Sequence, residues 1–470
     1  MKIIFVSSEC TPYSKTGGLA DVAGSLPKEL LKMGHDVLVI TPRYKEIRQN
    51  LEYVQDFKVN MHGKSMDAII RRHVQKINNR ELVTLFIDNA YYFDRDGMYC
   101  HSDEAERFAF FDKAASKIID FEHPDIIHLN DWQTGPIAVL VRDVYKNYSS
   151  RIVYTIHNME YNGQFSKSAL THFDLDPEIY FTIDKLEFYG DFSFSKAGIL
   201  YSDVITTVSP TYATEIQTPE YGFGYEGLLG QKAQQNKLFG IINGIDYDEY
   251  NPEKDESIFR KYTADSLDNK KANKPMLQEM LGLPVKDVPM ISVISRVVQH
   301  KGYDILIESL KTLLEKDIQF VQLGIGDSHY INRFYMLKER FGDKISINNV
   351  FDESLAKKIY AASDMFMIPS SFEPCGLSQL ISFRYGTIPI ARKTGGLNDT
   401  VIGFLGNRES GNGFTFFNSS KDDLTAVTNL ALREFENKEV WQMLQKRVMN
   451  LDYSWAKSAK QYEEIYKRVL

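Results

Sequence analysis

The chain has 470 residues, 43% of them hydrophobic and 25% charged, a balance that predicts roughly two globular domains and little disorder. Its formal net charge of −8 argues against a broad nucleic-acid surface, because such a surface needs Lys and Arg to neutralise phosphates. Cys10, Cys100 and Cys375 are too widely spaced to indicate disulfides or a cysteine-based metal site, and no apolar run reaches the ~18 residues of a membrane span. We therefore expect a cytoplasmic protein whose partners include neither nucleic acid nor membrane.

In the first half of the chain, short apolar runs bounded by turn residues predict buried parallel strands. They occupy residues 3–6, 37–40, 82–87, 126–129, 152–156 and 204–208. Stretches with helical spacing lie between them, at residues 20–33, 104–121 and 135–145. This alternation is typical of a doubly wound α/β sheet, so we assign residues 1–250 to a first α/β domain.

Residues 251–289 are charged, lysine-rich and interrupted by four prolines, which predicts a connection between domains with one short helix. A second alternation follows, with strands at 290–294, 320–323, 365–368 and 388–391 and helices near 304–314, 354–362 and 376–385. We assign residues 251–453 to a second α/β domain. Residues 454–470 carry apolar side chains at helical spacing, which predicts a terminal helix that packs back on the first domain.

Two doubly wound domains are expected to face each other across a cleft at the carboxyl ends of their strands, where such sheets bind ligands. The first strand-to-helix loop contains Lys15 and Gly18 within Lys-Thr-Gly-Gly. The positive charge of Lys15, and glycines that let the backbone approach a ligand closely, predict an anion site. A tight turn with an exposed lysine is the alternative. Arg296 and Lys301 share a loop after a strand of the second domain and can grip a diphosphate, unless they are simply solvated.

Motifs spread in order along the whole chain resemble those of bacterial glycogen synthases and plant starch synthases. They are Ser7-Ser8-Glu9, Lys15-Thr16-Gly17-Gly18-Leu19-Ala20-Asp21-Val22, His128-Leu129-Asn130-Asp131-Trp132, Thr155-Ile156-His157-Asn158, Val208-Ser209-Pro210, Asn243-Gly244-Ile245-Asp246, Ser295-Arg296, Lys301-Gly302, Glu373-Pro374-Cys375-Gly376-Leu377 and Thr394-Gly395-Gly396-Leu397. The resemblance implies the GT-B fold, with two Rossmann-like domains facing a cleft, the glucan acceptor on the first and the nucleotide-sugar on the second. It also implies a retaining glucosyltransferase that extends an α-1,4-glucan such as glycogen from ADP-glucose.

The resemblance implies roles for individual residues as well. Arg296 and Lys301 would hold the departing diphosphate, Glu373 would bind the sugar or steady positive charge near its anomeric carbon, and His157 would lie near the reacting carbon. Because this catalysis is electrostatic, it requires no metal and no cofactor. The residues expected to bind substrate are Lys15, Gly18, Asp131, Asn158, Cys375, Gly376, Thr394, Gly395 and Gly396.

Ordinary structural roles stay open for several of these side chains. A loop Glu such as Glu373 is often a surface residue or a helix cap, and a His that follows a strand is often structural. Asp131 and Asn158 can each cap a helix. Ser378 replaces a Thr that commonly follows Gly-Leu in the family, so side-chain contacts carried over to that position are less secure.

Other function classes fit the sequence less well. The main alternative is another GT-B glycosyltransferase with a different donor or a small acceptor. A glycan phosphorylase would need a pyridoxal phosphate site, for which no motif is present, and a non-catalytic glucan-binding protein need not keep Lys15, Arg296, Lys301 and Glu373. A dehydrogenase would need a dinucleotide fingerprint after the first strand, whereas the glycine motif at residues 222–227 follows no apolar strand and fits a loop near the acceptor better.

Overall fold

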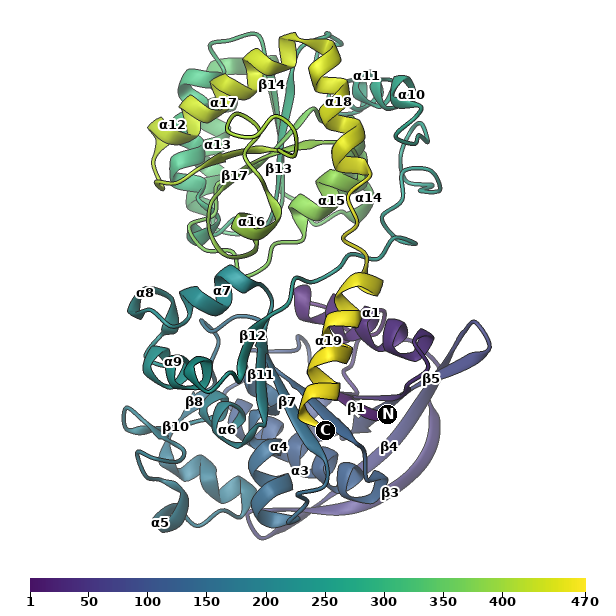
Figure 1. Cartoon of the computed structure of the whole chain (residues 1–470), viewed down its shortest axis with the longest axis vertical. Coiled ribbons are helices and arrows are strands. Elements are labelled where there is room, and N and C mark those ends of the chain that lie inside the picture. Colours follow the sequence, from purple (N-terminus) through teal and green to yellow (C-terminus); the bar gives the residue numbers. More distant parts are fainter. The chain divides into compact units, whose positions relative to one another are not determined.

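The computed structural model describes residues 1–470 and divides the chain into two compact units (Figure 1). The first unit comprises Met1–Asn243 and Trp455–Leu470, and the second comprises Gly244–Ser454. Residues 244–250, which the sequence analysis placed with the first domain, belong to the second unit. Ile245 forms a β-bridge with Ser454, and the Tyr247 hydroxyl donates to the Leu451 carbonyl at 3.0 Å.

The first unit is built on a nine-stranded sheet in the order β12-β11-β7-β6-β1-β2-β5-β4-β3. Its strands from β12 to β5 are parallel, and all of them except the edge strand β12 lie between two neighbours and have few exposed residues. The six buried strands predicted for this unit are therefore confirmed. The bounds are β1 Lys2–Val6, β2 Asp36–Pro42, β3 Glu52–Met61, β4 Lys64–Ile77, β5 Arg80–Asp88, β6 Ile126–Asn130, β7 Arg151–Ile156, β11 Val204–Thr207 and β12 Leu238–Gly240.

The antiparallel hairpin of β3 and β4 at one edge of this sheet was not predicted from the sequence. Most side chains of β3 are exposed, so the strand has no continuous apolar run to reveal it. A second, three-stranded sheet in the order β8-β10-β9 was also not predicted, and it is formed by β8 Gln164–Phe165, β9 Glu187–Phe188 and β10 Asp191–Ser193.

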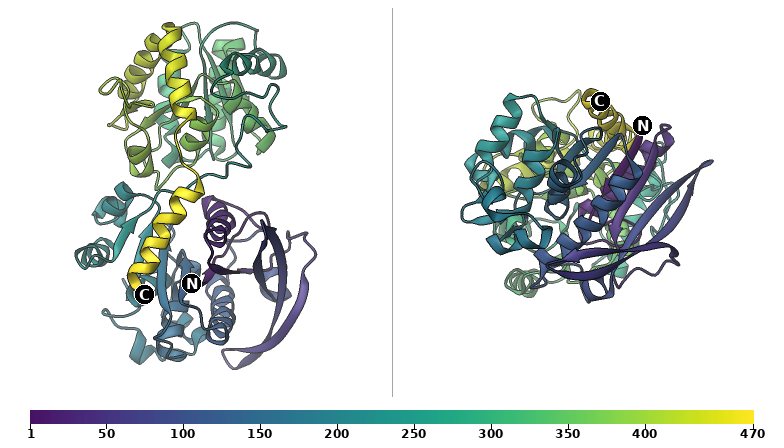
Figure 2. Two further views of the ribbon diagram at one scale, coloured as in Figure 1. Left: turned by 45° about the vertical axis from the view of Figure 1, so that its right-hand side comes forward. Right: turned by 90° about the horizontal axis from the view of Figure 1, so that it is seen from below.

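Helices accompany the sheet of the first unit. They are α1 Gly18–Lys32, α2 Ala90–Phe93, α3 Glu104–Glu122, α4 Gly135–Val139, α5 Pro177–Tyr180, α6 Phe194–Tyr201, α7 Pro210–Glu215, α8 Pro219–Gly222, α9 Glu226–Gln234 and α19 Trp455–Val469. The helix expected at 135–145 is α4 continued by a π-helical turn, Leu140–Val144. The terminal helix α19 lies against α1 (Figure 2), and its Tyr466 hydroxyl is 2.7 Å from Nδ1 of the buried His128.

The second unit holds a six-stranded, wholly parallel sheet in the order β15-β14-β13-β16-β17-β18. The strands are β13 Met290–Ile294, β14 Gln319–Leu323, β15 Ile345–Asn348, β16 Met365–Ile368, β17 Ile388–Arg392 and β18 Phe414–Phe416. The helices are α10 Leu267–Lys271, α11 Asn273–Met280, α12 Tyr303–Leu313, α13 Ser328–Phe341, α14 Glu353–Ala362, α15 Ser378–Arg384, α16 Gly395–Thr400, α17 Lys421–Glu436 and α18 Lys438–Met449.

The strands and helices expected in this second unit are confirmed, and two helices stand where one was expected before β13. The sequence analysis missed β15, β18, α13, α17 and α18. The predicted α/β class, with two Rossmann-like units, is therefore correct. Among the helices of the chain, none combines the length and apolar character needed to cross a membrane.

Each sheet contains a point where the strand order reverses. In the first unit β1 is followed outward by β2 and β5 on one side and by β6 and β7 on the other, and in the second unit β13 lies between β14 and β16. In open α/β sheets, ligands bind outside the carboxyl ends of the strands at such a switch point. Ligand-binding residues are therefore expected in the loops that follow β1 and β6 and in those that follow β13 and β16.

Candidate functional site

In the first unit, the loop after β1 is organised by a buried carboxylate, Glu9. Its Oε2 accepts hydrogen bonds from the backbone N–H groups of Thr16 at 2.6 Å and Gly17 at 3.2 Å. Its Oε1 accepts from the Thr16 hydroxyl at 2.7 Å and from the Tyr99 hydroxyl at 3.0 Å. Glu9 is only 4% exposed, so these donors take the place of water around its charge. The sequence analysis quoted Glu9 in a motif but gave it no role; its position directly after a buried strand was the available signal.

Lys15 and Gly18 occupy this organised loop. Lys15 is exposed, and its Nζ lies 2.8 Å from Oδ1 of Asp21 in α1. Gly18 is the first residue of α1, and no side chain caps that helix. Because Glu9 already accepts from the N–H groups of Thr16 and Gly17, an anion at this loop would meet N–H groups from Gly18 onward.

Asp131 and His157 come together at the carboxyl ends of β6 and β7. Asp131 adopts a positive φ of 56°, and its Oδ1 accepts a hydrogen bond from the backbone N–H of His157 at 2.7 Å. It makes no side-chain cap to the following helical turn, so the capping alternative is wrong for this residue. Burial raises the pKa of the Asp131 carboxyl to about 7, although hydrogen bonds from the N–H groups of His157 and Asn158 act in the opposite direction.

The His157 ring is neutral and its tautomer is defined by its neighbours. Burial lowers the pKa of His157 to about 3. Its Nε2 lies 3.0 Å from Oδ1 of Asn130, whose Nδ2 donates to the Val6 carbonyl at 2.9 Å. Since the amide nitrogen faces Val6, the oxygen faces the imidazole, and Nε2 must carry the hydrogen. The next residue, Asn158, accepts the N–H of Glu160 at 3.0 Å, which is a local turn contact.

At the switch point of the second unit, Lys301 and Glu373 form an ion pair. Lys301 Nζ lies 2.6 Å from Glu373 Oε2, and the two side chains are 18% and 12% exposed. The Ser370 hydroxyl donates to the same carboxylate oxygen at 3.1 Å. Arg296 follows β13 in the same loop region as Lys301 and is exposed. The structure therefore joins a cation and a carboxylate that the sequence analysis had assigned to different parts of a substrate.

The loops around Cys375 and Gly396 pack tightly against each other. The N–H of Gly396 donates to the carbonyls of Glu373 at 3.2 Å and Pro374 at 3.1 Å. A Cβ added to Gly395 would lie 2.0 Å from the Glu373 carbonyl oxygen, and one added to Gly396 would lie 2.0 Å from that of Cys375. These glycines are therefore needed for loop packing, and the N–H of Gly396, a residue expected to bind substrate, already donates within the protein.

Gly376 and Thr394 flank this packed pair of loops. Gly376 has a φ of 73°, a left-handed conformation that favours glycine. The Gln379 amide supports the turn by donating to the carbonyls of Cys375 at 3.1 Å and Gly376 at 2.8 Å. Thr394 precedes α16 and is buried. Cys375 is also buried, which is the environment of a packing residue.

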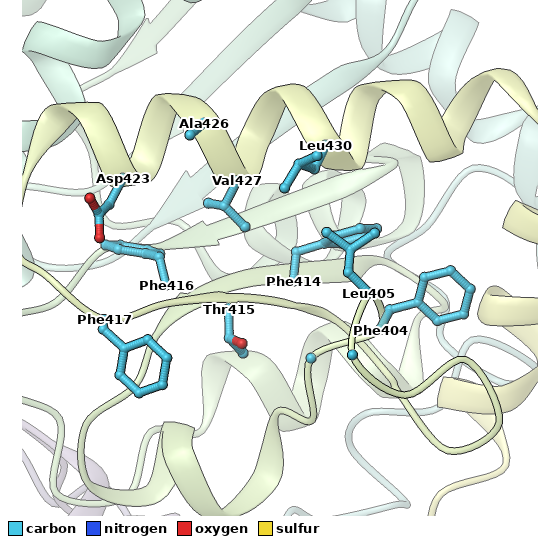
Figure 3. A pocket seen from close by; sticks show the side chains of 12 residues that line it. Phe404, Leu405, Phe414, Thr415, Phe416, Phe417, Asp423, Ala426, Val427 and Leu430 are labelled. Carbon is cyan, nitrogen blue, oxygen red and sulfur yellow. The ribbon is translucent and has the colours of Figure 1, made fainter.

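A cavity of about 370 Å³ opens elsewhere in the second unit, between β18 and α17 (Figure 3). Its walls are mostly apolar and include Phe404, Leu405, Phe414, Phe416, Phe417 and Leu430. None of the residues singled out from the sequence lines it. The loops at the switch points, rather than this cavity, carry the charged and hydrogen-bonding groups that chemistry requires.

Comparisons with known proteins bear on both units. Residues 2–231 match the family described as the starch synthase catalytic domain, and residues 282–443 match glycosyl transferases group 1. The chain is 47% identical to a glycogen synthase of Desulforudis audaxviator, with 99% of this chain and 96% of that protein covered. It is 34% identical, with a TM-score of 0.91, to the catalytic domain of starch synthase IV from Arabidopsis thaliana bound to ADP and acarbose, with 100% and 99% of the chains covered. A sucrose-phosphate synthase from Thermosynechococcus elongatus, 16% identical with a TM-score of 0.62 and coverages of 100% and 98%, shares the fold.

Proposed function

Because this chain belongs to the glycogen and starch synthase family, we propose that it transfers glucose from ADP-glucose to the end of an α-1,4-glucan with retention of configuration. The observation that carries the proposal is the similarity over the whole chain to a starch synthase domain bound to ADP and acarbose. The first unit would hold the glucan and the second unit the nucleotide-sugar. All cysteines are free thiols, which suits the reducing cytoplasm.

In this proposal, Arg296 and Lys301 bind the diphosphate of the donor. Arg296 is exposed and offers a planar fork of donors, and Lys301 offers a mobile ammonium. Lys301 is held by Glu373 at 2.6 Å, so in this proposal the donor phosphate competes with the carboxylate for the ammonium and draws it away. That exchange leaves the Glu373 carboxylate available for sugar hydroxyls or for positive charge near the anomeric carbon.

The transfer needs no strong base from the protein. The acceptor hydroxyl oxygen forms the new bond to the anomeric carbon on the face from which the diphosphate leaves, and the hydroxyl proton passes to a diphosphate oxygen. His157 contributes no positive charge, because burial lowers its pKa to about 3. Stabilisation of the leaving group therefore falls to Arg296 and Lys301.

The other residues expected from the sequence to bind substrate also have roles in this proposal. Lys15 would exchange Asp21 for an anionic part of the donor, and Gly18 would supply a backbone N–H. Asp131 would bind substrate hydroxyls through the oxygen that does not accept from His157. The backbones of the two packed loops would shape the site, and these loops contain Cys375, Gly376, Thr394, Gly395 and Gly396. Asn158 would shape it through the turn that its side chain supports by accepting from Glu160.

The test is transfer of labelled glucose to glycogen, with ADP-glucose and UDP-glucose compared at equal concentration. Incorporation mainly from ADP-glucose would support the proposal, whereas incorporation only from UDP-glucose would correct the nucleotide. No incorporation from either donor by folded protein would favour another GT-B reaction with a small acceptor.

The same assay tests the two proposed diphosphate ligands. Arg296→Ala and Lys301→Ala should each lower turnover about 100-fold, because they remove charge stabilisation from the leaving group. Arg333→Ala is the matched control, since Arg333 pairs with Asp304 at 3.2 Å on α12 and has no proposed role. Unchanged turnover in both test variants would rule out the roles given to Arg296 and Lys301.

A further inference from the structure

Two exposed aromatic side chains, Tyr189 and Phe223, lie on touching loops of the first unit. Tyr189 is 79% exposed and occupies the turn between β9 and β10, and Phe223 is 40% exposed and follows α8. A Cβ added to Gly224, the neighbour of Phe223, would lie 2.9 Å from Cε2 of the Tyr189 ring, so the two loops are in contact. Figure 1 shows β8, β10, α8 and α9 on one flank of this unit.

Neither residue suits the backbone conformation that it adopts. Tyr189 has a φ of 52° and Phe223 a φ of 49°, in the left-handed region. Tyr189 and Gly190 form a two-residue hairpin turn in which both φ values are positive, a position where Asn, Asp or Gly is preferred. Non-glycine residues in this region carry strain and cluster at functional sites. The two positions are therefore candidates for a functional role.

The Tyr189 ring is held in place by the aromatic side chain that precedes it. It meets the edge of the Phe188 ring, with centroids 4.8 Å apart and planes at 85°. Phe188 stacks on Tyr225 at 3.9 Å, and the Tyr225 hydroxyl lies 2.6 Å from the Ser193 hydroxyl in β10. A ring already fixed by its neighbours loses little conformational freedom when a ligand covers its free face.

Both loops belong to segments that begin at the carboxyl ends of two neighbouring parallel strands, β7 and β11. The segment leaving β7 contains His157 and continues into the small sheet that carries Tyr189, and the segment leaving the neighbouring strand β11 continues through α7 and α8 to Phe223. The glycine motif at residues 222–227 spans the end of α8, the turn beside Tyr189 and the start of α9, and it follows no strand directly.

We propose that Tyr189 and Phe223 form an aromatic platform on which glucose units of the α-1,4-glucan acceptor stack. Sugar rings present apolar C–H faces and polar edges, and aromatic rings offer a flat apolar surface, with a polar hydroxyl in the case of Tyr. This inference rests on the proposed function, because it takes its ligand from the reaction given there. It adds a binding surface for chain units beyond the one that reacts.

Substitution by Asn tests the platform without confusing binding with folding. Tyr189→Asn and Phe223→Asn remove the rings but suit the left-handed backbone, so the melting temperature should stay the same or rise. The KM for glycogen at saturating ADP-glucose should rise about fivefold in each variant, as expected for the loss of one stacked ring. The KM for ADP-glucose should change less than twofold.

Tyr148→Asn is the matched control. Tyr148 is 61% exposed and precedes the amino end of β7, whereas the two platform loops belong to segments that follow carboxyl ends of strands. Loss of the Tyr148 ring should therefore leave the KM for glycogen unchanged. Retardation of each protein in gels that contain glycogen measures the same affinity without any transfer reaction, and it should weaken only in the two platform variants. Wild-type retardation in Tyr189→Asn and Phe223→Asn, or equal losses in Tyr148→Asn, would overturn the platform, whereas failure of transfer in the wild type would count only against the proposed function.

Discussion

Replacing Glu373 by Gln should separate nucleotide binding from catalysis. In the structure, Glu373 Oε2 holds the Lys301 ammonium at 2.6 Å, and both side chains are mostly shielded from water, with 12% and 18% exposed. A hydrogen bond between charged groups contributes about 1.5 to 3 kcal/mol. If the ADP phosphates compete with this carboxylate for Lys301, Glu373→Gln should bind ADP about tenfold more tightly, a gain of about 1.4 kcal/mol.

The same substitution should lower turnover about 100-fold, because the variant has no carboxylate to steady positive charge at the reacting sugar. Titration calorimetry with ADP and the glucose-transfer assay would measure the two effects on one preparation. Asp364→Asn is the matched control, since Asp364 also pairs with a lysine, Lys274, at 2.6 Å in the second unit but lies outside the proposed site. An ADP affinity that is unchanged or weaker in Glu373→Gln would refute the competition between carboxylate and phosphate.

Three further substitutions test buried polar groups of the two units. Burial raises the pKa of Asp131 to about 7, so between about pH 4 and pH 7 the folded protein keeps a proton that the unfolded chain has released, and stability falls as pH rises through this window. Between pH 5 and pH 7, the free energy of unfolding measured with urea should therefore fall by about 1 to 2 kcal/mol less in Asp131→Asn than in the wild type. Equal decreases in the two proteins would contradict the raised pKa. Lys270→Met should lower the free energy of unfolding by about 2 to 4 kcal/mol, because the buried ammonium donates to the carbonyls of Ala361 at 2.8 Å and Ser363 at 3.1 Å; an unchanged urea midpoint would show that these acceptors find other donors. Tyr466→Phe should cost about 1 kcal/mol by removing the 2.7 Å hydrogen bond between α19 and His128, and thermal unfolding at the wild-type temperature would mean that the bond adds nothing.

The amino-acid sequence was sufficient for the α/β class and for the buried strands. A strand between two neighbours in a parallel sheet is apolar along its whole length, so β1, β6, β13 and β16 are visible as short apolar runs. The hairpin of β3 and β4 was not predicted, because an edge strand with a solvent-exposed face has no continuous apolar run. The motifs after β1, β6, β7, β13 and β16 were also readable, since each follows a strand that the sequence already reveals.

Only the tertiary structure decided how the polar groups in these loops are paired. Glu9 accepts four hydrogen bonds from residues up to 90 positions away, and Lys301 meets Glu373 across 72 positions. Sequence spacing carries no information about such contacts, because the intervening helices and strands set which loops become neighbours. The same reason explains why only the structure shows that Gly395 must be small, since the Glu373 carbonyl packs against it. It also explains why only the structure shows that the Tyr189 ring is exposed.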